Sequence, residues 1–277
     1  MKVYINTDIE GVAGWVFYAT MSDSLFNYHH IQRMNLLLTN EVNAAVKACF
    51  DSGADEVYVN DNHGHAYSII FEELDQRCKI IHGRAGRFPS WLPFLDESFD
   101  AAIGIGMHAM AGTPEAVCPH SYWHLTTGSG EEIALSECSM FAALAGEKSV
   151  PLVAISGDDK IATEIKLKIP DCESAIVKES LGPQNACSLI PAQACELIAE
   201  KVKAGLAKRK QIKPFKLKGP YKLNVSDRDP KIKALEKDTE GDNLWDLMHD
   251  TCRIFGNKWG DQSIDDRSWR FPDNVFK

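Results

Sequence analysis

Three features are missing from this sequence, and each absence excludes a class of protein. No stretch approaches the roughly 20 apolar residues that a membrane-spanning helix needs, so we expect no membrane association. The 8 cysteines are scattered without a CxxC pair, and a chain of this length does not need disulfides, so we expect reduced and mostly buried thiols. The 30 basic residues are outnumbered by 39 acidic ones, and the net charge of −9 argues against a nucleic-acid partner, which is bound by neutralising phosphates.

Common catalytic motifs are missing as well. The sequence contains no HExxH, no GxSxG and no phosphate-binding P-loop. Gly104-Ile105-Gly106 comes nearest to a dinucleotide fingerprint but lacks the third glycine, so a nucleotide-dependent oxidoreductase is poorly supported. The chain opens on a strand-like segment rather than a signal peptide, and we therefore expect a soluble, cytoplasmic protein.

What is present is the composition and rhythm of a globular α/β protein. The 277 residues are 44% hydrophobic and 25% charged, enough to bury one large core or two smaller ones. Short apolar runs predict strands at 2–5, 56–59, 78–81, 101–106 and 151–155. Apolar residues at helical spacing predict helices at about 28–52, 134–146, 158–168 and 190–207. This alternation indicates an α/β fold with a mainly parallel sheet flanked by helices.

The composition changes near residue 210. Residues 201–221 are rich in lysine and contain no acid, which fits either a helix C-terminus with its linker or a weak anion-binding or RNA-binding patch. Pro214 and Gly219-Pro220 mark a boundary. We therefore expect a main domain over 1–210 and a smaller C-terminal lobe over 211–277. That lobe contains Trp245, Trp259 and Trp269.

Polar side chains gather where the predicted strands end. Asp8 and Glu10 follow the first strand two positions apart, a spacing that puts both side chains on one face of a strand. Two carboxylates in one cavity repel each other, and a divalent cation relieves that repulsion most simply. The same pair is also common in solvated turns, so it does not define a site by itself.

Two histidines also follow predicted strands. His63 follows the second strand, where one ring nitrogen is available to a metal while Asp61 orients the ring. His108 follows the strand at 101–106. The alternatives are that His63 lies in an ordinary turn and that His108 is a hydrogen-bonded histidine of the core. Because ligands bind beyond the carboxyl ends of parallel strands, we expect both histidines to lie near Asp8 and Glu10.

Glu137 is the fifth candidate ligand. It lies in the otherwise apolar segment 133–142, and an acid inside such a helix is seldom buried without a metal or a cationic partner. Oxygen and nitrogen ligands without thiolate suit zinc, manganese or iron in a catalytic site. Five candidates exceed the needs of one four-coordinate zinc that also holds water, so a shared carboxylate between two ions, a two-metal hydrolytic centre, is indicated.

His120 is a candidate of a different kind. It lies on the loop-like segment 111–121 that follows His108. If this loop covers the site, His120 is placed to act as a general acid or base. The alternative is that His120 is an ordinary surface histidine.

Six ordered segments of the chain resemble the zinc D-aminopeptidases of the dipeptide-operon type. The first is Val-Tyr-Ile-Asn-Thr-Asp-Ile-Glu-Gly-Val-Ala-Gly at 3–14, and the others lie at 59–63, 106–109, 113–121, 136–137 and 150–159. Their order and approximate spacing are kept over about residues 1–200. The tryptophan-containing tail does not follow the family's pattern.

The resemblance implies a metal centre with two zinc ions. Asp8 would bridge both ions, Glu10 and His108 would bind one, and His63 and Glu137 would bind the other. Family members release N-terminal D-residues from short peptides and assemble into a ring-shaped decamer. A short peptide substrate and a homo-oligomer, in the form of a decameric ring, are therefore the expectations for this chain.

The resemblance also implies that His120 is the catalytic histidine, which the family assigns as the nucleophile. A general acid/base or a stabiliser of the transition state is chemically at least as reasonable. Two alternatives to a zinc-dependent aminopeptidase stay open. One is a related metal-dependent amidase for another small amide, and the other is a non-catalytic metal- or ligand-binding protein of the same fold. The complete set of candidates favours an enzyme, and no motif indicates D- or L-stereoselectivity.

Overall fold

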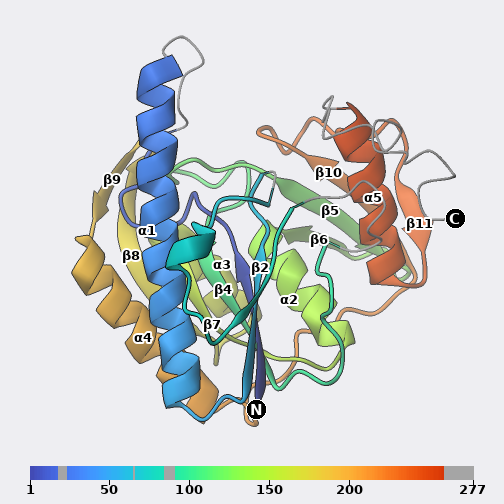
Figure 1. Ribbon diagram of the computed structural model, residues 1–277. Coiled ribbons are helices and arrows are strands. Elements are labelled where there is room, and N and C mark those ends of the chain that lie inside the picture. The colour runs from blue at the N-terminus through green and yellow to red at the C-terminus, as the bar shows by residue number, and fades with distance from the viewer. Residues whose placement is uncertain (18–23, 65, 84–90, 259–277) are drawn as a thin grey trace, which may run out of the picture.

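The computed structural model describes residues 1–17, 24–64, 66–83 and 91–258 (Figure 1). The strands are β1 (Lys2–Thr7), β2 (Glu56–Asp61), β3 (Lys79–Ile81), β4 (Ala101–Met107), β5 (Tyr122–Thr127), β6 (Glu132–Leu135), β7 (Leu152–Asp158), β8 (Glu173–Gly182), β9 (Asn185–Ser188), β10 (Tyr221–Ser226) and β11 (Thr239–Gly241). The helices are α1 (Ser24–Asp51), α2 (Glu137–Glu147), α3 (Asp159–Lys168), α4 (Pro191–Ala207) and α5 (Leu244–Lys258), with a short 3-10 turn, η1 (Phe71–Glu73).

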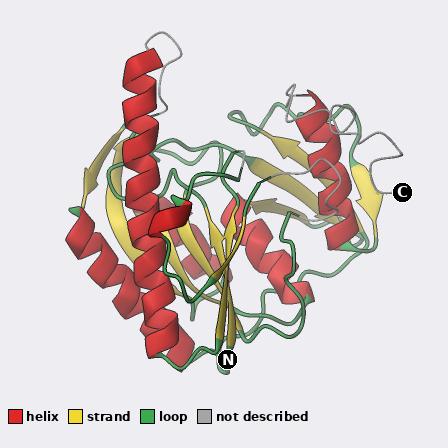
Figure 2. Cartoon of the chain, in the orientation of Figure 1, coloured by secondary structure: helices red, strands yellow, loops and turns green. Residues whose placement is uncertain are grey.

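The large sheet has seven strands in the order β3-β2-β1-β4-β7-β8-β9. Its neighbouring strands run parallel, apart from the antiparallel pair of β8 and β9. Helix α1 packs against α4 on one face of the sheet, and α2 packs against α3 on the other (Figures 1 and 2). Strands β4 and β7 are buried along their whole length, as expected for parallel strands covered on both faces. The predicted α/β fold with a mainly parallel sheet is confirmed.

A second, antiparallel sheet has the strand order β11-β10-β5-β6, and helix α5 packs against β10 and β11 (Figure 1). This sheet combines residues 122–135 with residues 221–241, so the smaller lobe takes strands from both sides of position 210. The division of the chain at residue 210 stays a prediction. Within that lobe, Trp245 Nε1 donates to Leu144 O on α2 at 3.1 Å, while Trp259 and Trp269 lie outside the described residues.

One predicted helix begins in the wrong place. The apolar segment expected to start a helix at residue 134 instead forms strand β6, and α2 starts only at Glu137. Ser136 sets this start because its side chain accepts from Ser139 N, and the Ser139 side chain in turn accepts from Ser136 N, which completes a capping box. At the N-terminal end of the chain, α1 begins at Ser24, about one turn earlier than expected.

Two expectations from composition can be compared with the described residues. No helix among them combines the length and the apolar character that crossing a membrane requires. Seven cysteines among them are free thiols, of which Cys49, Cys118, Cys138 and Cys172 are buried, whereas Cys187 is exposed.

Candidate metal centre

The carboxyl ends of three neighbouring strands, β2, β1 and β4, meet at one edge of the large sheet. Asp8 and Glu10 follow β1, His63 follows β2, and His108 comes directly after β4. The segment after β1 stays attached to β4, because Asp8 N donates to Ile105 O at 2.8 Å. Parallel chain direction thus brings the four predicted residues to the same place.

Two glycines allow the segments after β1 and β4 to touch backbone to backbone. A Cβ on Gly11 would lie 2.0 Å from Met107 O. Gly106 has a φ of +75°, and a Cβ there would lie 2.2 Å from Asp8 O. Only residues without a side chain fit this contact.

The small sheet supplies the remaining two residues. His120 comes two positions before β5, and Glu137 comes two positions after β6. The two strands form an antiparallel pair in which Trp123 lies opposite Leu135. The start of β5 therefore lies beside the end of β6, and this register brings His120 and Glu137 together.

The first part of the cluster joins Glu10 to His63. Glu10 Oε1 lies 3.2 Å from His63 Nε2, and the other ring nitrogen of His63 lies 3.1 Å from Ser68 Oγ. Asp61 was expected to orient the His63 ring directly, but it accepts instead from the backbone N–H groups of Ser68 and Ile69 at 2.7 and 2.8 Å. It therefore shapes the loop, and Ser68 contacts the ring.

The second part of the cluster surrounds His108. Its Nε2 atom lies 3.3 Å from Asp8 Oδ2 and 3.7 Å from Glu137 Oε1. Its Nδ1 atom donates to Ala109 O at 2.8 Å, which directs Nε2 at the two carboxylates. His108 and Asp8 are both buried.

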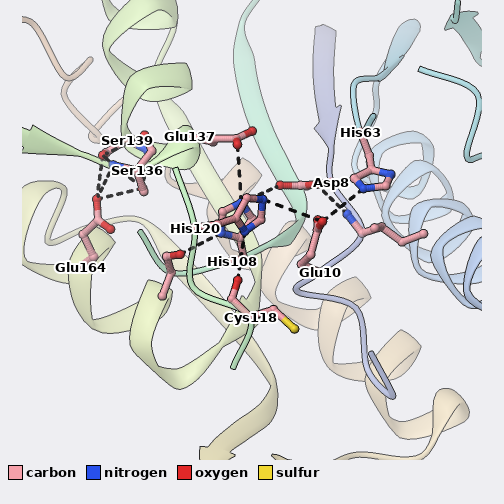
Figure 3. A network of polar contacts seen from close by, with 12 residues as sticks. Asp8, Glu10, His63, His108, Cys118, His120, Ser136, Glu137, Ser139 and Glu164 are labelled. Carbon is pink, nitrogen blue, oxygen red and sulfur yellow. Dashed lines mark hydrogen bonds and ion pairs between the residues drawn. The ribbon is translucent and has the colours of Figure 1, made fainter. Parts of the chain in front are cut away.

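His120 lies flat against the His108 ring. The two ring centroids are 3.8 Å apart with an interplanar angle of 14°. His120 Nδ1 lies 3.0 Å from Cys118 O, and its Nε2 lies 3.9 Å from Glu10 Oε1. Figure 3 shows this ring between the Glu10 and Glu137 carboxylates.

Three carboxylates and three imidazoles thus form one cluster. Its ligand atoms fall into three groups of three, and within each group they lie within 4.8 Å of one another. These groups are Asp8 with Glu10 and His63, Asp8 with His108 and Glu137, and Glu10 with His108 and His120. Asp8 belongs to the two groups that include a second carboxylate. The shortest contacts join Glu10 to His63 at 3.2 Å and His108 to Asp8 at 3.3 Å. The groups that contain Asp8 place Glu10 with His63 and His108 with Glu137, a different division from the one that the family resemblance implies.

Comparison with known proteins agrees with the fold and the sequence segments. The family model described as D-aminopeptidase matches residues 1–235. The chain belongs to the D-aminopeptidase family. A D-aminopeptidase of Bacillus subtilis (strain 168) is 30% identical to it over 215 residues, which cover 78% of this chain and 77% of that relative. The predicted family, and an aminopeptidase as the class of enzyme, are confirmed.

A solved structure also resembles this family member. It is that of the zinc-dependent D-aminopeptidase DppA from Bacillus subtilis, described as a self-compartmentalizing protease. The TM-score is 0.77 at 24% sequence identity, and the match covers 93% of this chain and 97% of the other. At this identity the match supports the arrangement of strands and helices.

The D-aminopeptidase family member buries strongly interacting charges in this cluster. Burial and the neighbouring Glu10 carboxylate raise the pKa of Asp8 well above its usual range. Burial alone would lower the pKa of His108, but Glu137 and Asp8 raise it to about 10. Burial would likewise raise the pKa of Glu137, but His108 lowers it to about 2. His108 therefore supplies positive charge to the carboxylates around it.

His120 behaves differently from the other histidines of the cluster. Burial lowers its pKa, and the neighbouring His108 lowers it further. Burial also acts to lower the pKa of His63, but the Glu10 carboxylate outweighs it and raises the value. Among the three imidazoles of the cluster, His120 is therefore the one that stays neutral most readily.

Several supporting residues were not anticipated from the sequence. Ser136 and Ser139, at the start of α2, donate through their hydroxyls to Glu164 Oε1 at 2.9 and 2.7 Å (Figure 3). Lys178 is buried beneath the loop that follows β1. A lysine in the otherwise apolar run Ala175-Ile176-Val177 was the one signal in the sequence that pointed to such a role.

Proposed function

We propose that this D-aminopeptidase family member is a zinc-dependent enzyme that releases the N-terminal residue, a D-amino acid, from short peptides. The observation that carries the proposal is the largely buried cluster of carboxylates and imidazoles beyond the ends of β1, β2 and β4. Two zinc ions would be held there by the five predicted ligands. These are Asp8, Glu10, His63, His108 and Glu137.

Two orphaned atoms support a bound cation. His108 Nε2 and Glu10 Oε2 are buried, and neither makes a hydrogen bond. Leaving such a group unsatisfied costs about 1–3 kcal/mol, and a cation bound between the carboxylates would remove that cost. The oxygen and nitrogen donors, without a thiolate, are those of catalytic zinc sites. The zinc dependence of the related DppA supports this choice of metal.

The position of Asp8 supports two ions rather than one. Its carboxylate belongs both to the group with Glu10 and His63 and to the group with His108 and Glu137. A carboxylate shared between two groups is suited to bridging two cations. Zinc ions bound in this way would supply Lewis acidity toward the peptide carbonyl.

His120 would then move the proton. Its Nδ1–H donates to Cys118 O, so Nε2 is the proton-accepting nitrogen of the neutral ring. The lowered pKa favours that neutral form near neutral pH. Nε2 faces the cluster, 3.9 Å from Glu10 Oε1, where it is placed to accept a proton during hydrolysis and return it to the departing amine.

Assembly and location complete the proposal. The related DppA is described as self-compartmentalizing, which supports a homo-oligomer. A decameric ring is the form that the family resemblance implies. We propose that this D-aminopeptidase family member works in the cytoplasm, on peptides small enough to enter the interior of such an oligomer.

A stereochemically matched assay tests the function. Zinc-loaded protein is incubated with pairs of D- and L-alanyl amides and dipeptides, and release of the N-terminal residue is followed with and without chelator. We expect chelator-sensitive release of D-alanine. Equal release from both isomers would disprove the D-preference, and metal-loaded protein that releases neither would disprove the aminopeptidase assignment for these substrates.

A further inference from the structure

Lys178 is a cation inside the protein, on strand β8, with 1% of its surface exposed. Its ammonium donates to the main-chain carbonyls of Glu10, Val12 and Trp15, the last two at 3.1 and 2.7 Å. An ammonium has three donors, so these bonds use its full capacity. Burying a cation is costly unless such partners compensate for the lost water, which indicates a specific role for this one.

All three acceptors belong to one segment, residues 10–15, which carries Glu10 into the cluster. The backbone N–H groups of this segment donate to acceptors in separate parts of the fold. Gly11 N donates to Gly106 O at 2.8 Å, Ala13 N to Glu41 Oε1 at 2.9 Å, and Gly14 N to Ser188 Oγ at 3.3 Å. A segment without regular secondary structure is thus fixed by backbone and side-chain partners together, and Lys178 joins its beginning, middle and end.

The two ends of that segment both face His63. At the beginning, Glu10 Oε1 lies 3.2 Å from His63 Nε2. At the end, the Trp15 ring packs edge-on against the His63 ring, with centroids 6.3 Å apart. A displacement of the segment would therefore move Glu10 and the wall of the His63 site together.

We propose that Lys178 is a positioning residue for the Glu10–His63 part of the metal centre. It acts through the backbone of residues 10–15, because it bonds to the Glu10 carbonyl rather than to the carboxylate. This inference rests on the proposed zinc function. A residue of this kind sets metal affinity, and loss of a supporting contact typically weakens metal binding about 10- to 100-fold.

Zinc titration of metal-free protein tests the proposal without using activity. Lys178→Met keeps the length of the side chain but removes the charge and the donors. Val177→Ala is the matched control, since Val177 is the adjacent residue of β8, is fully buried, and its substitution loosens the core while leaving Lys178 in place. All titrations are made by calorimetry below the unfolding temperature of each variant.

We expect one of the two zinc-binding steps of Lys178→Met to weaken about 10- to 100-fold, and both steps of Val177→Ala to stay as in the wild type. Wild-type affinity at both steps in Lys178→Met would overturn the positioning role. Equal weakening in Val177→Ala would also overturn it, because general loosening of the core would then explain the effect. A wild-type chain that binds no zinc would disprove the proposed function itself.

Lys178→Arg decides the case in which Lys178→Met does not fold. Arginine keeps the buried charge, but its planar, fork-shaped guanidinium cannot reproduce the three bonds of an ammonium. We expect a folded variant with one weakened zinc-binding step. Wild-type zinc binding in Lys178→Arg would mean that the fold needs only the charge, and the positioning role would be refuted.

Discussion

The two sheets bring residues to the metal centre through different geometry. The large sheet supplies Asp8, Glu10, His63 and His108 through chain direction, since parallel neighbours end at the same edge. The small sheet supplies His120 and Glu137 through register, since the residue before one strand must lie beside the residue after its antiparallel partner. A register slip of one residue would reverse every side chain, so the second arrangement depends more strongly on local packing. Substitutions in the two regions should therefore fail in different ways.

The largest effect is expected in the large sheet, at the residue shared by two ligand groups. Asp8→Ala should reduce bound zinc from two equivalents toward none and abolish turnover, whereas His63→Ala should remove about one equivalent. Elemental analysis after dialysis measures both. Asp171→Ala, at an exposed aspartate, is the control and should keep the full metal content. Loss of one equivalent in both Asp8→Ala and His63→Ala would refute the bridging role.

On the small-sheet side, His120→Ala should lower kcat about 100- to 10,000-fold while zinc content stays unchanged, because in the proposed function His120 moves a proton and does not hold a metal. Steady-state kinetics and elemental analysis on one preparation separate these two readouts. His124→Ala is the matched control, because His124 lies on β5, the strand that follows His120, but bonds to Ser226 Oγ at 2.7 Å, outside the cluster. Parallel loss of zinc and activity in His120→Ala would identify it as a ligand instead.

A smaller effect is expected where α3 supports the start of α2. Glu164 accepts from two serine hydroxyls next to Glu137, and Glu164→Ala should lower the free energy of unfolding by about 1–3 kcal/mol. Denaturant titration measures this loss, with Glu200→Ala on the exposed surface of α4 as the control. We also expect zinc binding to weaken up to about 10-fold. An unfolding midpoint unchanged from the wild type would show that the helix start does not depend on this contact.

The contrast between the sheets also explains what the sequence predicts well. Strands such as Ala101–Met107 are short, apolar and followed by a polar residue, so both the parallel sheet and the convergence of His108 with Asp8 were predictable. Local sequence therefore identifies residues that chain direction alone brings together. Glu137 was predicted as an acid within an apolar segment and His120 from its position on a loop, and the fold places both in the same cluster.

What the sequence does not predict depends on partners that are distant along the chain. Strand β6 is only four residues long and apolar at its end, so the segment that leads into Glu137 was mistaken for part of a helix. Lys178 lies 168 residues from Glu10, and no local pattern indicates which carbonyls a buried ammonium will meet. The contact of Ser68 with His63 likewise depends on a loop shape that Asp61 imposes.

The glycine contact between the ends of β1 and β4 matters for anyone who wishes to change the substrate range of this enzyme. Gly11 and Gly106 lie beside the ligands and would be natural targets for saturation libraries, yet a methyl group at either position would overlap a backbone oxygen. Most library members at these sites would be misfolded clones rather than new specificities. Substitutions are better introduced at side chains that contact a proposed ligand without being ligands themselves, such as Trp15 and Ser68, which both contact His63.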